Sequence, residues 1–204
     1  MSNMVYTIGH SNHDIQVFIG LLRRHDVTAL VDVRSHPYSR YVPQYSREAL
    51  KDELTKAAIS YVFLGKELGV RSDNPACYRM GKVQYDLLAK EPGFTEGLQR
   101  ILQGMERYRI ALMCAEKDPL NCHRALLVAR KLYEQGVAVS HIHADGTLES
   151  HPDLESRLLA TCKFPAGDLF KDRAQFVSEA YTIQSARVAY HDEAREQIEE
   201  NAAL

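Results

Sequence analysis

The sequence RIALMCAEKDPLNCHR, residues Arg109 to Arg124, decides the fold prediction for this chain. It begins with the apolar run Ile110–Cys114, which has the length and bulk of a buried strand. A charged turn follows, and an apolar helical pattern starts directly after Arg124. A strand, a polar loop and a helix start that carry two thiols, an imidazole and a guanidinium are a common place for chemistry in an α/β protein.

Upstream of this stretch, the chain predicts a strand, a helix and a second strand. Met4 to Ile8 is a short apolar run, and apolar residues then recur at helical spacing. Val27 to Val33 is β-branched and apolar until Asp32. A unit of this length favours a parallel, right-handed crossover. We therefore expect His10 and Arg34 to follow the carboxyl ends of two neighbouring strands.

Two more strands are expected at Ile59–Leu64 and Val137–His143, with one helix starting after Ser46 and another over Phe94–Met105. Strands that alternate with helices in this way are typical of a parallel sheet covered on both faces. The predicted fold class is therefore α/β, with an open, mainly parallel sheet of about five strands and helices on both faces.

The C-terminal part of the chain is less regular. We predict that residues 1–146 form the α/β domain and that residues 147–204 form a C-terminal extension packed on the same domain. Within the extension, residues 152–159 are expected to be helical and residues 179–190 to form one or two edge strands. Residues 191–204 predict a charged helix or a frayed tail.

Composition limits the class of protein. With 45% apolar and 25% charged residues, the 204-residue chain matches a soluble globular protein. The net charge of −2 argues against a surface that binds nucleic acid everywhere, but it allows a local basic patch. The sequence contains no apolar run long enough to span a membrane and no signal-peptide pattern. Four cysteines, two of them in one charged loop, fit reduced thiols, so we expect a cytoplasmic protein without a membrane partner and leave its oligomeric state open.

Four motifs together resemble a known family. They are GHSN at Gly9–Asn12, DVRSHPYSR at Asp32–Arg40, LG at Leu68–Gly69 and CAEKDPLNCHR at Cys114–Arg124. The resemblance is to the family catalogued as domain of unknown function 488, and it covers roughly residues 4–143. It implies a compact α/β fold in which these motifs belong together, and it implies no particular activity.

Polar residues from several segments should meet at one edge of the predicted sheet. His10, Asp32, Arg34 and residues 114–118 all follow predicted strands. Ligands of open α/β sheets bind outside the carboxyl ends of the strands. Because these residue types differ from ordinary turn composition, we expect them to share one binding pocket rather than only to end their strands.

Arginine side chains near this edge indicate an anionic substrate. Guanidinium groups suit phosphate or carboxylate, and tyrosines interleaved with arginines in residues 34–47 could stack on bases. We therefore expect a phosphate-bearing small molecule, including a nucleotide, or a nucleic acid. The predicted substrate-binding residues are Arg34, Arg40, Arg124, His123, Ser11 and Tyr41.

Three residues are candidates for catalysis. Glu116 or His10 could act as a general acid or base, and Cys114 could act as a nucleophile or form a wall of the site. The leading hypothesis is an enzyme that acts on its anionic substrate by hydrolysis or group transfer. The rival is a non-catalytic nucleic-acid-binding or regulatory module that uses residues 34–47, so the sequence leaves open whether the protein is an enzyme.

A rhodanese-like or phosphatase-like thiol enzyme is a third alternative. In those folds a strand delivers a cysteine into a loop that wraps an anion and ends at an arginine, and LVDVR at Leu30–Arg34 also resembles the rhodanese pattern. Here nine residues separate Cys114 from Arg124, and Glu116 and Asp118 lie among them. Two carboxylates would repel a bound anion, which argues against this alternative.

Cys114, Cys122 and His123 could instead hold zinc or another divalent metal, because sulfur and imidazole nitrogen are donors that zinc accepts. Against this, adjacent cysteine and histidine are awkward ligands for one ion, and no second pair has zinc spacing. We therefore assign no metal ligand from the sequence, and the cofactor stays open. Cys122 could equally cap the helix that follows it.

Overall fold

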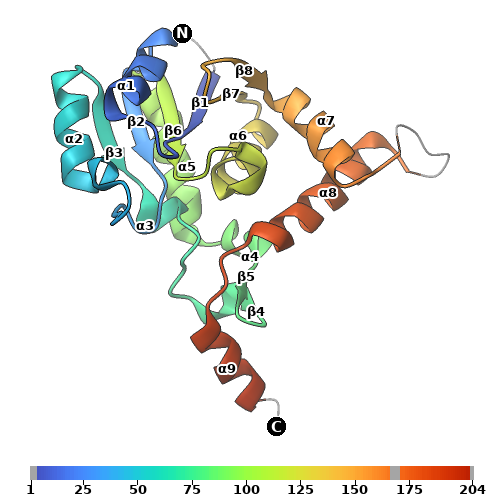
Figure 1. The fold of residues 1–204 in the computed structure, drawn as a ribbon. Coiled ribbons are helices and arrows are strands. Elements are labelled where there is room, and N and C mark those ends of the chain that lie inside the picture. Colours follow the sequence, from blue (N-terminus) through green and yellow to red (C-terminus); the bar gives the residue numbers. More distant parts are fainter. Residues whose placement is uncertain (1–3, 166–170, 203–204) are drawn as a thin grey trace.

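A computed structural model of the chain describes residues 4–165 and 171–202. Its centre is a six-stranded sheet in the order β3-β2-β6-β1-β7-β8, in which all neighbours pair in parallel except β7 and β8 (Figure 1). The sheet contains β1 (Met4–Gly9), β2 (Ala29–Asp32), β3 (Ser60–Phe63), β6 (Ile110–Cys114), β7 (Ala138–Ile142) and β8 (Leu148–Ser150). A separate hairpin consists of β4 (Tyr78–Arg79) and β5 (Lys82–Val83).

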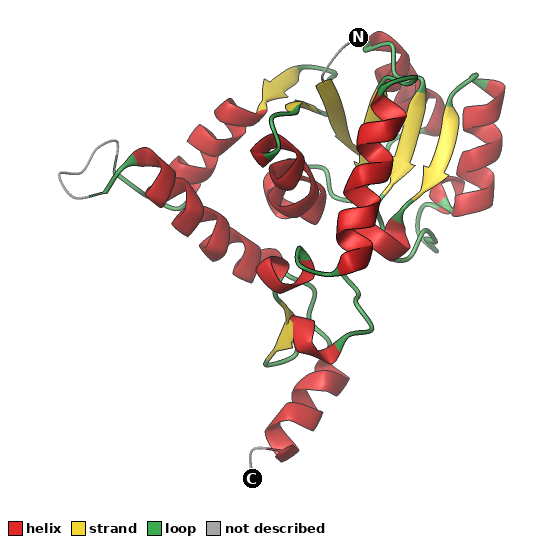
Figure 2. Ribbon diagram, turned by 180° about the vertical axis from the view of Figure 1, so that it is seen from behind, coloured by secondary structure: helices red, strands yellow, loops and turns green. Residues whose placement is uncertain are grey.

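Helices cover both faces of the sheet, which confirms the predicted fold class (Figures 1 and 2). α1 (Ile15–Arg24) and α2 (Arg47–Lys56) pack on one face. α5 (Pro92–Met105), the π-helical segment η4 (Arg124–Ala129), α6 (Arg130–Glu134) and α7 (His151–Thr161) pack on the other. α8 (Arg173–Val188) packs outside this layer, against α7 and η4. The remaining helices are α3 (Gly65–Leu68), α4 (Tyr85–Leu88) and α9 (Glu193–Ala202), and short 3₁₀ turns include η1 (Pro43–Tyr45) and η3 (Pro119–Asn121).

The strand order corrects one expectation. β1 and β2 are not neighbours, because β6 lies between them and pairs with both: Tyr6 and Leu30 both lie opposite Ala111. The chain reaches this central position only after leaving the sheet edge at β3 and crossing back through α5. β6, which begins the Arg109–Arg124 stretch, therefore occupies the middle of the sheet, with the ends of β1 and β2 on either side of it.

The C-terminal extension is helical where edge strands were predicted. Residues 179–190 belong mostly to α8, so the strand prediction is wrong. Asp172 caps this helix and forms a capping box with Gln175, and Phe176 and Ala180 are buried one helical turn apart. α7 confirms the predicted helix over residues 152–159. α9 is the predicted charged helix of the tail. The last two residues of the predicted tail, 203–204, lie outside the described residues. β8 was not predicted, since it has only three residues after a turn.

None of the helices in the described parts of the chain is long and apolar enough to cross a lipid bilayer.

A chain of buried polar side chains connects the sheet to the extension. Thr7 Oγ1 lies 2.8 Å from His141 Nδ1, and His141 Nε2 lies 3.1 Å from His151 Nδ1. His151 Nε2 lies 3.0 Å from the hydroxyl of Tyr181 on α8. Burial, helped by the charge of Arg130, lowers the pKa of His151 to about 4. His151 is therefore neutral in the folded protein at neutral pH.

We predict that His151 makes the fold less stable in mild acid. The unfolded chain takes up this proton near the ordinary pKa of 6.5, whereas the folded protein takes it up only near 4, so stability is lost as pH falls through this interval. The loss from this residue should reach about 2 kcal/mol between about pH 7 and pH 5. Urea unfolding at several pH values, for the parent and for His151→Gln, measures it. Parallel pH curves for the two proteins would contradict the prediction.

Candidate functional site

A cavity of about 290 Å³ opens at the carboxyl ends of β2 and β6. The ends of these strands, the charged loop after β6 and the start of η4 form its floor. Val188, the last residue of α8, and Tyr190, which follows this helix, also line it. Its lining comprises Arg34, Ser35, His36, Val70, Arg71, Tyr85, Cys114, Ala115, Glu116, Asn121, Cys122, His123, Val188 and Tyr190.

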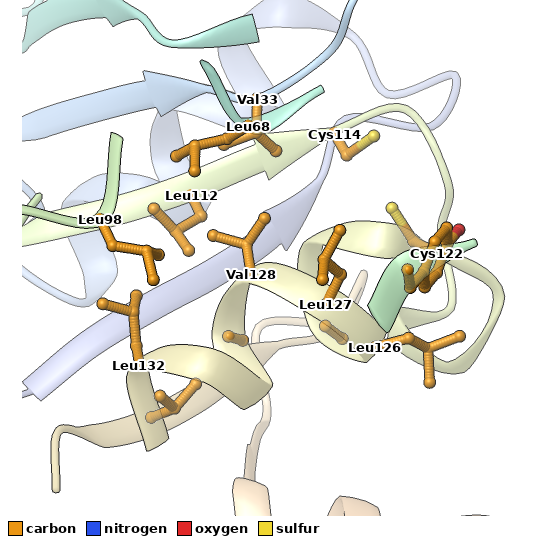
Figure 3. Packing of buried hydrophobic residues seen from close by; sticks show 14 of the residues in the cluster. Val33, Leu68, Leu98, Leu112, Cys114, Cys122, Leu126, Leu127, Val128 and Leu132 are labelled. Atoms are coloured by element: carbon orange, nitrogen blue, oxygen red, sulfur yellow. The ribbon is translucent and has the colours of Figure 1, made fainter. Parts of the chain in front are cut away.

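Two sulfurs and one imidazole meet on this floor. Cys114 is the last residue of β6, and the sulfur of Cys122 points towards it (Figure 3). His123 Nδ1 lies 3.7 Å from Cys114 Sγ and 3.9 Å from Cys122 Sγ. All three residues are buried, and their donor atoms lie within 4.8 Å of one another. The sequence predicts this group of three only as a possible metal site and gives Cys122 no catalytic role.

The imidazole of His123 is oriented by the backbone. Its Nε2 lies 3.0 Å from the carbonyl oxygen of Val33, the residue after β2. A carbonyl can only accept a hydrogen bond, so Nε2 carries the proton and donates it. Nδ1 of the neutral ring is then the unprotonated nitrogen, and its lone pair faces the two sulfurs.

Cys122 lies at the start of a helix. Its backbone is extended, its carbonyl accepts hydrogen bonds from Ala125 N and Leu126 N, and its Sγ accepts the N–H of Arg124 at 3.5 Å. These bonds confirm the alternative that Cys122 caps the helix. The backbone N–H groups and the helix dipole at this end favour negative charge on the sulfur.

The two thiols have opposite pKa shifts because they share one hydrogen bond. Burial opposes ionisation of Cys122, but the hydrogen bond from Cys114, the charge of Arg124 and the contact with His123 outweigh it and hold the pKa of Cys122 well below its usual range. The hydrogen bond to Cys122, together with burial, raises the pKa of Cys114 well above its usual range. Of the two thiols, Cys122 is therefore the one that ionises more readily, and Cys114 donates the hydrogen bond.

Arg34 forms a buried ion pair with Asp32 at the back of the cavity. Its Nε and Nη2 donate to the two carboxylate oxygens of Asp32 at 2.9 and 2.6 Å, and Nη2 also donates to Tyr45 O. Nη1 donates to His10 Nε2 at 3.1 Å. Four of the five guanidinium N–H groups are therefore used within the protein, and one on Nη1 is left for a ligand.

His10 lies behind Arg34 rather than in the cavity. Its ring stacks on Tyr45 with centroids 4.2 Å apart, and its Nδ1 donates to Ser11 O at 2.8 Å. Burial and the neighbouring charge of Arg34 lower the pKa of His10 to about 4. His10 is thus a neutral acceptor that positions Arg34, whereas the sequence predicted an acid or base that meets the substrate.

Arg124 is completely buried beneath the charged loop. Its Nη1 and Nη2 donate to the carbonyl oxygens of Glu116 and Lys117, and its Nε has no hydrogen-bond partner. The loop therefore turns carbonyl oxygens inward, towards its own arginine. A loop that wraps an anion would turn N–H groups inward, which is the arrangement that a rhodanese-like or phosphatase-like enzyme requires.

The two carboxylates of the loop have different surroundings. Glu116 is exposed, and it lines both this cavity and a neighbouring one of about 620 Å³. Asp118 accepts two hydrogen bonds from Arg157 at 3.0 and 3.1 Å. Burial raises the pKa of Asp118, but these bonds and the hydrogen bond from the N–H of Leu120 outweigh burial and hold the pKa below its ordinary value. Asp118 anchors the loop, and Glu116 is the carboxylate that borders the cavity.

Besides the buried Arg124, three predicted binding residues lie outside the cavity lining. Arg40 is exposed, Tyr41 is 97% exposed, and Ser11 directs its hydroxyl to Asn12. Sequence reasoning in turn missed two side chains that line the cavity, Arg71 and Tyr190, whose guanidinium and ring lie 4.5 Å apart. Arg71 lies two residues after the LG motif at Leu68–Gly69, which is a signal for it, but nothing in the sequence links it to Tyr190.

Comparison with known protein families identifies a relationship. The family model described as "Domain of unknown function DUF488" matches residues 14–131, which is more than half of the chain. Searches of curated proteins and of solved structures found no match.

The loop leaves no room for a side chain on Gly9. A Cβ there would lie 1.9 Å from Glu116 O, so Gly9→Ala must displace the loop that covers Arg124. Overpacking of this kind costs about 1–3 kcal/mol. We predict a lower urea midpoint for Gly9→Ala and faster alkylation of Cys114 by iodoacetamide, as the loop loosens.

Gly20→Ala is the matched control for this substitution. Gly20 lies inside α1, and a Cβ there meets nothing within 4 Å. Alanine should raise the helix stability by about 0.5–1 kcal/mol. Equal midpoints for the two variants would show that the contact between Gly9 and the loop does not constrain the site.

Proposed function

The chain belongs to the DUF488 family, and from its site we propose that it is a thiol-dependent enzyme that acts on a small anionic substrate by hydrolysis or group transfer. The observation that carries the proposal is the approach of His123 Nδ1 to the sulfurs of Cys114 and Cys122 at 3.7 and 3.9 Å. A thiol beside an oriented base is the arrangement that nucleophilic catalysis by cysteine requires.

Cys122 is the proposed nucleophile. It lines the cavity, and its sulfur accepts the N–H of Arg124 at the start of the helix. His123 takes up the thiol proton at Nδ1 while Val33 O holds the other ring nitrogen in place. The sulfur bonds to the electrophilic atom of the substrate, and the leaving group departs with the electron pair of the broken bond and a proton from His123. Water or a second substrate then releases the transferred group.

Two arginines supply the preference for an anion. Arg34 retains one N–H for a ligand, and the exposed guanidinium of Arg71 lies at the cavity edge. Arg124 holds the loop from beneath and supports the site without touching the substrate. Cys114 hydrogen-bonds the attacking sulfur. Glu116 remains a candidate acid or base at the cavity edge.

Reduced thiols of this kind fit the cytoplasm as the location we propose.

Alkylation by reagents of equal size and different charge tests the proposal. We predict that iodoacetate modifies Cys122 faster than iodoacetamide does, on the order of 10-fold at low salt, because the cavity attracts the carboxylate. Arg71→Gln should reduce this preference, and Cys162, which lies outside the cavity, should show none. Mass spectrometry of the modified peptides measures both rates. Equal rates at Cys122 in the parent would contradict an anion-selective thiol site.

Turnover is the second measurement. A panel of phosphate monoesters, phosphodiesters and nucleotides, assayed in the absence of added metal, should yield activity that Cys122→Ser and His123→Gln abolish. Cys162→Ser should retain it as the matched control. Circular dichroism checks that each variant is folded. Full activity in a folded Cys122→Ser protein would overturn the assignment of the nucleophile.

A nucleic-acid-binding module is a second candidate, favoured by the exposed aromatic residues of the loop 34–47. Tyr38 is 71% and Tyr41 97% exposed, and Arg40 is exposed between them. Such a surface could stack bases and contact phosphates.

For this second candidate we predict binding of single-stranded oligonucleotides that weakens steeply with salt. Arg40→Ala and Tyr41→Ala should reduce the affinity, and Cys122→Ser should leave it unchanged. Arg23→Ala, an exposed arginine at the end of α1, serves as the control. Fluorescence anisotropy measures the binding, and an equal loss in Arg23→Ala would show that the loop is not a specific surface.

A further inference from the structure

We propose that Cys114, Cys122 and His123 bind one divalent metal ion of the zinc class, with the fourth coordination position facing the cavity. The inference goes beyond the thiol reaction and does not depend on it. Among the side chains described in residues 4–165 and 171–197, these three form the one group of histidine, cysteine or carboxylate residues whose ligand atoms come together in this way.

The spacing of the three donor atoms fits a tetrahedral ion. Zinc binds sulfur at about 2.3 Å and nitrogen at about 2.0 Å, which places a sulfur and a nitrogen on one ion about 3.5 Å apart. The two sulfur–nitrogen distances in the protein are 3.7 and 3.9 Å. A contraction of a few tenths of an ångström would bring each sulfur–nitrogen pair to this spacing. The two sulfurs lie within 4.8 Å of each other and would approach to about 3.8 Å on a tetrahedral ion.

The surroundings of the donors are those of a prepared metal site. A metal-binding histidine usually donates its second ring nitrogen to a carbonyl or carboxylate, and His123 Nε2 donates to Val33 O at 3.0 Å. The lone pair of Nδ1 is thereby directed at the position between the sulfurs. Cys122 Sγ is also fixed, because it accepts the backbone N–H of Arg124.

A change in backbone conformation allows neighbouring residues to serve one ion. Cys122 is extended, with φ −144° and ψ 137°, whereas His123 is helical, with φ −59° and ψ −25°. This change directs both side chains towards Cys114. His123 also uses Nδ1, the ring nitrogen nearer the backbone, which shortens its reach.

Charge and access favour a metal with an open position. Two thiolates would offset the charge of a divalent ion, and the charge of the neighbouring Arg34 is balanced by its ion pair with Asp32. Structural zinc sites have four protein ligands, whereas zinc sites with three protein ligands leave one place for water or substrate. Here that place faces the cavity lined by Arg71, Asn121 and His36.

Cobalt binding tests the site directly. In reduced protein under nitrogen, we expect Co²⁺ to produce thiolate-to-cobalt absorption and intense visible bands of a tetrahedral ion, saturating at one equivalent and bleached by Zn²⁺. Cys114→Ser, Cys122→Ser and His123→Gln should each weaken zinc binding by on the order of 100-fold or more. Cys162→Ser is the matched control and should bind as the parent does.

Protection from alkylation is a second measurement that needs only the parent protein. Metal bound through sulfur occupies the lone pair that attacks iodoacetate, so Zn²⁺ should slow modification of Cys114 and Cys122 and leave Cys162 unaffected. The proposal is overturned if the parent shows no charge-transfer absorption with Co²⁺, or if a folded His123→Gln protein binds Co²⁺ as tightly as the parent does. Because the metal measurements do not require turnover, a failure here is distinct from a failure of the proposed enzyme activity.

Discussion

The buried ion pair between Asp32 and Arg34 is the constraint on which the site depends. Asp32 is fully buried at the end of β2, and it accepts hydrogen bonds from Arg34 and from Tyr61 on β3. Removing one partner of such a pair would leave an uncompensated buried charge, at a cost of about 3–5 kcal/mol. Val33 lies between the two charged residues, so the pair also fixes the carbonyl that orients the imidazole of His123. A stabilising interaction of the sheet thereby sets the direction of a chemical group in the cavity.

Buried arginines support the site from beneath. Arg34 is held by Asp32, and Arg124 by carbonyl oxygens of the loop that it carries. The sequence shows that arginines gather in these motifs, but it does not show whether their N–H groups face a ligand or the backbone. That difference depends on burial, which is complete for Arg124, and on the approach of Gly9 to the loop. The presence of a charged residue in a sequence motif is therefore weaker evidence for substrate binding than the location of its side chain on the cavity wall.

Local patterns predicted most of the elements, and contacts between distant residues decided the rest. The apolar runs at residues 27–33 and 110–114 are correctly predicted strands, because burial of a parallel strand is visible in its composition. The insertion of β6 between β1 and β2 is not visible there, since it depends on pairing between residues such as Tyr6 and Ala111. The wrong strand prediction over residues 179–190 of the extension has another cause. The predicted strand began at residue 179, which cut off the cap at Asp172 and so removed the evidence for a helix.

The meeting of Cys114, Cys122 and His123 could be predicted only in part. Their common loop was evident, but spacing rules for metal ligands assume regular backbone and disfavour adjacent cysteine and histidine. The change from extended to helical backbone between Cys122 and His123 removes that objection. One geometry then suits two chemistries, because the unprotonated Nδ1 that could accept a thiol proton is also the lone pair that could bind a metal. The carbonyl of Val33 prepares the ring for either role, so the choice between them depends on whether a proton or a metal ion occupies the space between the sulfurs and the imidazole.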